Sequence, residues 1–207
     1  GIPRLFAFGG YDHRWRTLDS CEFLDFDEDE EKEWILMEAK MKAPRCLTAA
    51  ALLDMNTAVI CGGRSMNETD LTSCEALDLS TLSFSDLPDM MEPRSYHAAV
   101  HYKGTIVVLG GAGKKKTCEQ FDPAVSKWTP FAPLNEGRHS FGAAVVEGKI
   151  YAAGDVDSVE VYDGSVWSVV TQLLRSRYYG SAVALGGKLV VLGGTNEEID
   201  VFDPATN

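Results

Sequence analysis

Four arginines recur along the chain at intervals of roughly 40 to 50 residues, and each precedes a short run of small or apolar residues. They are Arg45, Arg94, Arg138 and Arg177. A guanidinium group can pair with a carboxylate or a phosphate through two hydrogen bonds, so these residues predict recognition of an anion. Arginines at one position of a repeat can equally bind main-chain carbonyl groups around a central channel. The sequence leaves both interpretations open.

Acidic residues recur in the same way, within a five-residue pattern that ends in Asp. The pattern occurs at residues 21–25, 74–78, 118–122, 159–163 and 199–203. Glu22, Glu75, Glu119 and Glu160 share one position in it, which favours bonding to neighbouring loops over catalysis, because catalytic groups are usually unique. Cys21, Cys74 and Cys118 also share one position, and we expect them to be small buried side chains.

Four kinds of short segment surround these residues. Apolar runs close on glycine at residues 5–10, 58–63, 106–111, 150–154 and 189–194. The acidic pattern alternates with period two and ends in a residue that favours turns, which predicts a second strand followed by a tight turn. Trp34, Phe84, Trp128 and Trp167 begin a third, and the arginines begin a fourth. Glycine pairs permit turns with positive φ, and small residues suit a crowded innermost strand.

The predicted fold is all-β. Four short strands in each unit, without helical periodicity, fit the four-stranded antiparallel blades of a β-propeller. We expect one domain over residues 1–207, with units at roughly 1–43, 44–92, 93–136, 137–175 and 176–207. The first unit lacks an arginine-led strand and the last stops before an aromatic strand. We therefore expect either further sequence or pairing of the open strand edges with another chain, including self-association.

Composition excludes several functions. The net charge of −12 disfavours nucleic acid, whose phosphates require a basic surface. No apolar run is long enough for a membrane helix, and we expect no membrane partner. The five cysteines form no CxxC pair, which favours reduced thiols in the cytoplasm. We expect no cofactor and no bound metal.

The double glycines, the aromatic-Asp element and the spaced tryptophans resemble the Kelch repeat, over essentially the whole chain. Residues 9–12 with 18–22, and residues 91–100, are closer still to the Kelch-like adaptor family. That resemblance implies a six-bladed ring. It also implies a protein-binding module of the kind that, joined to BTB and BACK domains, recruits substrates to cullin-based ubiquitin ligases. Other Kelch proteins bind actin or act as scaffolds, and this alternative stays open.

The alternating strand directions place the loops after the double glycines and the loops before the arginines on one face. Lys114, Lys115 and Lys116 also fall there, whereas the acidic run at residues 27–31 falls on the opposite face. We therefore expect a basic face that binds an acidic or phosphorylated peptide of a protein partner. Arg64 follows its double glycine and, by the resemblance, corresponds to a substrate-contacting arginine. The candidate partner-binding residues are Arg14, Trp15, Arg16, Arg64, Arg94, Tyr96, Arg138, His139, Arg177 and Tyr178.

An enzyme is the competing class. His97 and His139 begin arginine-led strands near Tyr96, Tyr178 and Tyr179, which is a weak pattern for a copper oxidase of Kelch architecture. Arg94, Arg138 and Asp155 would suit a sugar-ring isomerase built on similar blades. The sequence contains no GxSxG, HExxH or phosphate-binding glycine loop. We therefore expect a non-enzymatic interaction module with no catalytic residues.

Overall fold

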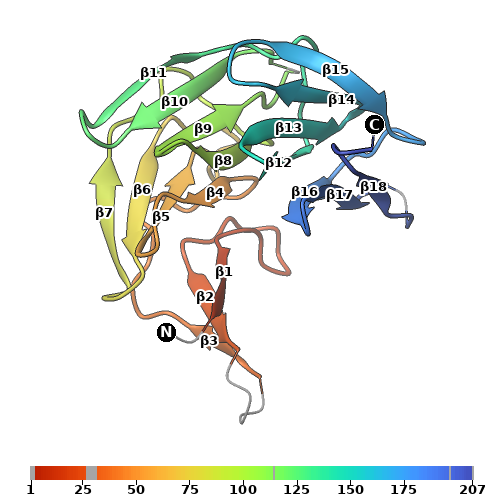
Figure 1. The fold of residues 1–207 in the computed structure, drawn as a ribbon. Coiled ribbons are helices and arrows are strands. Elements are labelled where there is room, and N and C mark those ends of the chain that lie inside the picture. Colours follow the sequence, from red (N-terminus) through yellow and green to blue (C-terminus); the bar gives the residue numbers. More distant parts are fainter. Residues whose placement is uncertain (1–2, 27–31, 114, 196, 207) are drawn as a thin grey trace.

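A computed structural model describes residues 3–26, 32–113, 115–195 and 197–206. These residues form β-strands β1 to β18 in five antiparallel sheets. In Figure 1 the sheets stand around a common axis, so the predicted all-β propeller is confirmed. No helix long and apolar enough to cross a membrane occurs in the described part of the chain.

Each sheet is formed by strands that follow one another in sequence. Sheet 1 holds β1 (Arg4–Phe8), β2 (Cys21–Asp25) and β3 (Trp34–Leu36). Sheet 2 holds β4 (Ala49–Leu52), β5 (Thr57–Cys61), β6 (Cys74–Asp78) and β7 (Ser83–Leu87). Sheet 3 holds β8 (Ala98–Tyr102), β9 (Thr105–Leu109), β10 (Cys118–Asp122) and β11 (Lys127–Phe131). Sheet 4 holds β12 (Gly142–Val146), β13 (Lys149–Gly154), β14 (Val156–Tyr162) and β15 (Trp167–Gln172). Sheet 5 holds β16 (Gly180–Leu185), β17 (Lys188–Gly193) and β18 (Asp200–Phe202).

The arginine-led strands are the innermost ones. Strand β4 lies beside β8, β8 beside β12, and β12 beside β16, while β7, β11 and β15 form the rim (Figure 1). The small residues of these strands allow the close approach. A Cβ atom added to Gly142 would lie 2.7 Å from the Cβ of Ala182, which is closer than real side chains come.

The first and last sheets have three strands each, as the sequence predicts. Sheet 1 begins with its double-glycine strand β1, and sheet 5 ends with the acidic-pattern strand β18. Among the described residues, no strand pairs with the inner edge of β1 or with the outer edge of β18. The six-bladed ring stays a prediction.

The core lies between successive sheets. Its four clusters of buried side chains join sheets 1 and 2, 2 and 3, 3 and 4, and 4 and 5. Cys21, Cys74 and Cys118 are buried in these layers, which confirms that prediction. Because adjacent sheets are clamped together in this way, the loops at the two ends of the sheets are held on a rigid frame.

Candidate functional site

The four repeated arginines are buried in the frame. Arg94 is fully buried, and its guanidinium donates to the carbonyl oxygens of Gly110 and Thr117 at 2.7 and 2.8 Å. It also pairs with Glu119 at 2.9 Å. The same pairing joins Arg45 to Glu75, Arg138 to Glu160 and Arg177 to Asp200. Each arginine thus ties the glycine turn after the second strand of a sheet to the acidic strand of the same sheet.

This burial corrects part of the predicted site. Arg94 and Arg138 expose none of their surface and Arg177 exposes 1%. A partner on the surface cannot contact a guanidinium that is already saturated by carbonyl and carboxylate oxygens. These three residues therefore hold the frame instead of forming the partner-binding surface that the sequence predicts.

The repeated glutamates serve the same frame, as predicted. Glu119 accepts hydrogen bonds from the main-chain N–H groups of Met91 and Glu92 at 2.6 and 3.2 Å. Glu160 accepts in the same way from Asn135 and Glu136. Glu22 occupies the same repeat position in sheet 1, but its side chain is exposed.

Four residues with a left-handed backbone conformation follow the arginines. Leu47, Tyr96, Ser140 and Tyr179, each two residues after its arginine, have positive φ values of 53, 56, 53 and 62°. Their main chains bond in series, because the N–H of Tyr96 donates to Leu47, that of Ser140 to Tyr96, and that of Tyr179 to Ser140. A left-handed backbone is costly for residues other than glycine, and such residues often lie at functional sites.

Aromatic side chains gather around these four left-handed positions. The guanidinium of Arg64 lies 5.6 Å from the ring centroid of Tyr96. Tyr96 lies 6.2 Å from His139 and 6.1 Å from Tyr179, and His139 lies 6.1 Å from Tyr178. We call these five residues the axial cluster. Tyr178 and Tyr179 expose 37% and 68% of their surface.

The first loop of sheet 1 extends this cluster. Tyr11 packs against Trp15 with 5.7 Å between ring centroids, and Trp15 is 80% exposed. A hydrogen bond with Cys46, together with burial, raises the pKa of Tyr11 to about 12, while the charge of Arg64 acts in the opposite direction. Tyr11 is therefore a neighbour of both sheet 2 and Arg64. Trp15, Tyr11 and the axial cluster form one surface, which we call the axial strip.

The axial strip is less basic than the sequence predicts. Arg64 pairs with Asp70 at 2.9 Å, and this partner raises the pKa of Arg64 further. Arg16 pairs with Asp12 at 2.7 Å, and Lys115 pairs with Glu92 at 3.1 Å. Arg14 is exposed and donates to the ring of His13. Lys114 and the acidic run at residues 27–31 lie outside the described residues.

The histidines that would suit a copper site lie in different surroundings. His139 bonds to the buried carboxylate of Asp155 at 3.0 Å. His97 is buried and its ring lies beside Gly62, and burial lowers the pKa of His97 to about 3. Among the described residues, no group of three or more His, Cys, Asp or Glu side chains has the geometry of a metal site.

Several residues of this surface are missing from the sequence-based site. Tyr179 and Tyr11 supply much of its exposed aromatic area, and Asp70 and Asp155 orient Arg64 and His139. Tyr179 directly follows the predicted Tyr178, and Tyr11 directly follows a double glycine. Those positions are the only sequence signals for them, because the left-handed turn that presents Tyr179 cannot be read from residue types.

Comparison with known proteins agrees with this architecture. A family model described as the Kelch motif matches residues 93–135, which begin just before Arg94 and run past Trp128. The chain is a Kelch-repeat β-propeller related to the Kelch-like proteins. It is 30% identical to spermatocyte protein spe-26 of Caenorhabditis elegans, over 92% of this chain and 36% of that protein. It is 30% identical to Kelch-like protein 40 of Mus musculus, over 84% of this chain and 30% of that protein.

The Kelch propeller thus spans about a third of the length of the curated relatives that it matches. A solved structure, that of YjhT, superposes with a TM-score of 0.77 over 98% of this chain and 78% of that one. At 12% identity, this similarity shows the fold alone.

Proposed function

We propose that the Kelch propeller is a protein-interaction module that binds its partner on the axial strip. The observation that carries this proposal is the continuous set of partly exposed rings from Trp15 to Tyr178, held on a backbone fixed by its own hydrogen bonds. Tyr, Trp and Arg are the residue types enriched at interface hot spots. They bury a large area at a low cost in side-chain entropy, particularly where the scaffold is already rigid.

The partner segment that suits this surface carries an acidic or phosphorylated group next to apolar residues. Arg14 is exposed, and Arg64 keeps 29% of its side-chain surface accessible beside the ring of Tyr96. A carboxylate or phosphate of the partner would compete with Asp70 for Arg64, and its neighbours would pack on Tyr179 and Trp15. Among the predicted residues, Arg14, Trp15, Arg16, Arg64, Tyr96, His139 and Tyr178 remain in the proposed interface.

The cellular context is a further part of the proposal. Relatives named as Kelch-like proteins support a role as the substrate-receiving part of a cullin-based ubiquitin ligase in the cytoplasm. In this role the propeller recognises the substrate and performs no chemistry itself.

Affinity capture from cell extract, read by mass spectrometry, tests the proposal. Three forms of the chain are compared: native, Arg64→Glu with Tyr179→Ala, and Met55→Ala. Met55 is 98% exposed in the turn between β4 and β5, away from the axial strip. Thermal melts establish that all three forms fold. We expect the native and Met55→Ala chains to retain a discrete partner that the double variant loses. Equal capture by all three forms would contradict the proposal.

A further inference from the structure

Sheet 4 departs from the double-glycine pattern at one position. Asp155 follows Gly154, where the other four units have a second glycine: Gly10, Gly63, Gly111 and Gly194. The main chain of Asp155 keeps the conformation and the hydrogen bond of that glycine, since its φ angle is 65° and its N–H donates to the carbonyl of Arg177 at 2.7 Å. The N–H of Gly111 donates to Arg138 in the same way. A left-handed backbone is costly for a residue other than glycine, so the turn alone does not explain an aspartate here.

The carboxylate of Asp155 holds the ring of His139. The side chain of Asp155 is fully buried, and its Oδ2 accepts the main-chain N–H of His139 at 3.0 Å. The same oxygen lies 3.0 Å from Nδ1 of the His139 ring. An ionised carboxylate accepts hydrogen bonds and cannot donate one, so the ring bonds to it through a proton on Nδ1. In the neutral ring, Nε2 then has no proton and can only accept a hydrogen bond.

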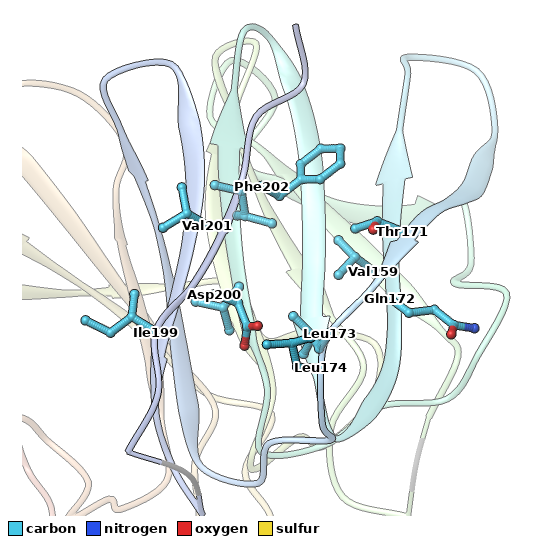
Figure 2. Close-up of a pocket in the computed structure, with 11 residues that line it drawn as sticks. Val159, Thr171, Gln172, Leu173, Leu174, Ile199, Asp200, Val201 and Phe202 are labelled. Atoms are coloured by element: carbon cyan, nitrogen blue, oxygen red, sulfur yellow. The ribbon is translucent and has the colours of Figure 1, made fainter. Parts of the chain in front are cut away.

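The strand after Asp155 is anchored in the core. Strand β14 begins directly after Asp155, and its Val159 is buried between sheets 4 and 5. Figure 2 shows the ring of Phe202 on the side of β18 that faces Val159. The next residue, Glu160, pairs with the arginine that directly precedes His139 in the sequence. Asp155 and His139 are therefore both held on a fixed backbone.

Nε2 of His139 is open to solvent. The ring of His139 lies between Tyr96 and Tyr178, at 6.2 and 6.1 Å between ring centroids, and 29% of its side-chain surface is accessible. No described residue bonds to Nε2, and this atom is not one of the buried polar atoms that lack a partner, so solvent reaches it. The inner strands β8 and β16 lie on the two sides of β12, so the surroundings of His139 do not depend on either end of the chain.

We propose that His139, oriented by Asp155, is a specificity-determining contact of the axial strip, and that its Nε2 accepts a hydrogen bond from a hydroxyl or amide group of the partner. This inference rests on the proposed function, because it assigns one contact on that surface. Arg64 and His139 both lie beside the ring of Tyr96, so a short partner segment reaches both. The acidic group of the segment binds Arg64, and a Ser, Thr, Asn or Gln side chain next to it donates to Nε2.

The fixed acceptor also excludes other groups at this position of the partner. A carboxylate has no proton to donate to Nε2, and an apolar side chain would cover the nitrogen and leave it unpaired, which costs free energy. Specificity arises from such unfavourable contacts with the wrong partner as well as from favourable contacts with the right one. The segment is therefore acidic at Arg64 and neutral but polar at His139.

Nitrogen-15 NMR of the imidazole rings tests the role of Asp155. The variant Asp155→Gly restores the glycine of the other units, so it keeps the turn and removes the carboxylate. At pH 8 we expect the native His139 ring to carry its proton on Nδ1 and to have an unprotonated Nε2, and the signals missing from His139→Asn identify this ring. Asp155→Gly should lose the preference for Nδ1. A native ring that is protonated on Nε2 overturns the proposal, and a proton on both nitrogens would assign an anion to His139 instead.

Binding to a peptide array tests the contact itself. Each peptide carries one glutamate, and the residues next to it are varied. Variants at position 139 separate the two ends of the ring, because the side-chain amide of Asn lies as many bonds from Cα as Nδ1 does, and that of Gln as many as Nε2. His139→Asn thus keeps a bond to Asp155 and loses the contact with the peptide, whereas His139→Gln restores that contact. Met55→Ala serves as the control protein, and thermal melts establish folding.

We expect the native and Met55→Ala chains to prefer Ser, Thr, Asn or Gln over Ala beside the glutamate. The best peptide should bind His139→Asn and Asp155→Gly about three- to tenfold more weakly, as the loss of one hydrogen bond implies, and His139→Gln within about twofold of the native chain. If Asp155→Gly does not fold, His139→Asn decides alone. Equal binding to the native chain and to folded His139→Asn, or no preference beside the glutamate, overturns this contact.

The axial strip itself is tested with the same array. Arg64→Glu with Tyr179→Ala should abolish binding of every peptide. If this double variant loses binding and folded His139→Asn keeps it, the contact at His139 is overturned and the proposed function stands. If the native chain binds no peptide, or the double variant binds as well as the native chain, both proposals are overturned.

Discussion

The buried pair of Arg138 and Glu160 offers the sharpest test of the frame, through the substitution Glu160→Gln. Both side chains are fully buried, and the guanidinium donates to Glu160 at 3.1 and 3.2 Å. The carboxylate also accepts the N–H groups of Asn135 and Glu136, so it ties β14 to the segment that connects β11 with β12. The amide that replaces it keeps the shape and loses the charge.

The expected loss of stability comes from the charge of Arg138, which stays buried without its partner. Removing one partner of a buried ion pair leaves an uncompensated charge and typically destabilises a protein by about 3–5 kcal/mol. Each kcal/mol shifts the melting temperature of a chain of this size by roughly 2–4 °C, so we expect a decrease of roughly 6–20 °C. Glu22→Gln is the matched control, because Glu22 has the same repeat position and an exposed side chain. Its cost should stay within about 0.5 kcal/mol.

Thermal and urea unfolding of both variants, followed by circular dichroism, provide the measurement. The reasoning is refuted if Glu160→Gln melts within a degree or two of Glu22→Gln. In that case the buried arginines would not need their acidic partners for stability, and another reason would have to explain why an arginine recurs at this position.

Three further predictions concern the core. His97 is neutral in the fold, with a pKa of about 3, and takes up a proton below about pH 6.5 when unfolded, so stability should fall by about 2 kcal/mol from pH 7 to pH 5. Urea titrations at pH 7 and pH 5 should show that His97→Asn loses less stability between the two pH values than the native chain, whereas the control His101→Gln loses as much. If His97→Asn loses as much stability as the native chain, His97 is not the group responsible. Trp128 is buried against Phe121, so Trp128→Ala should lower the unfolding free energy by about 3–5 kcal/mol. Trp34 is exposed, so Trp34→Ala should lower it by less than about 1 kcal/mol, and equal losses in urea titrations would contradict the stabilising role of Trp128. All five thiols are buried, so a thiol reagent should label the native chain far more slowly than the unfolded chain, and rapid labelling of folded protein would show that the sheets open.

Much of the fold could be predicted from the sequence because its signals repeat. The period-two acidic pattern gave all five of its strands, and the double glycines mark turns that require positive φ, as at Gly110 and Gly111. The two three-stranded sheets were also predictable, since the first unit has no arginine-led strand and the last has no aromatic strand.

The site was less predictable because residue type does not reveal burial. Arg94 and Arg64 look alike in sequence, but Arg94 points into the carbonyl-rich interior and Arg64 remains partly exposed beside Tyr96. The charge of the face likewise depends on pairs such as Arg64 with Asp70, which become neighbours only when the loop folds.

Photocrosslinking tests the central claim, that the axial strip binds a protein partner, most directly. A photoreactive amino acid is placed at position 179 in one chain and at position 55 in another, and each is irradiated in cell extract. We predict a discrete protein adduct from position 179, where the native Tyr179 is 68% exposed beside Tyr96, and none of that mass from position 55. The same adduct from both positions, or an adduct from position 55 alone, would contradict the account.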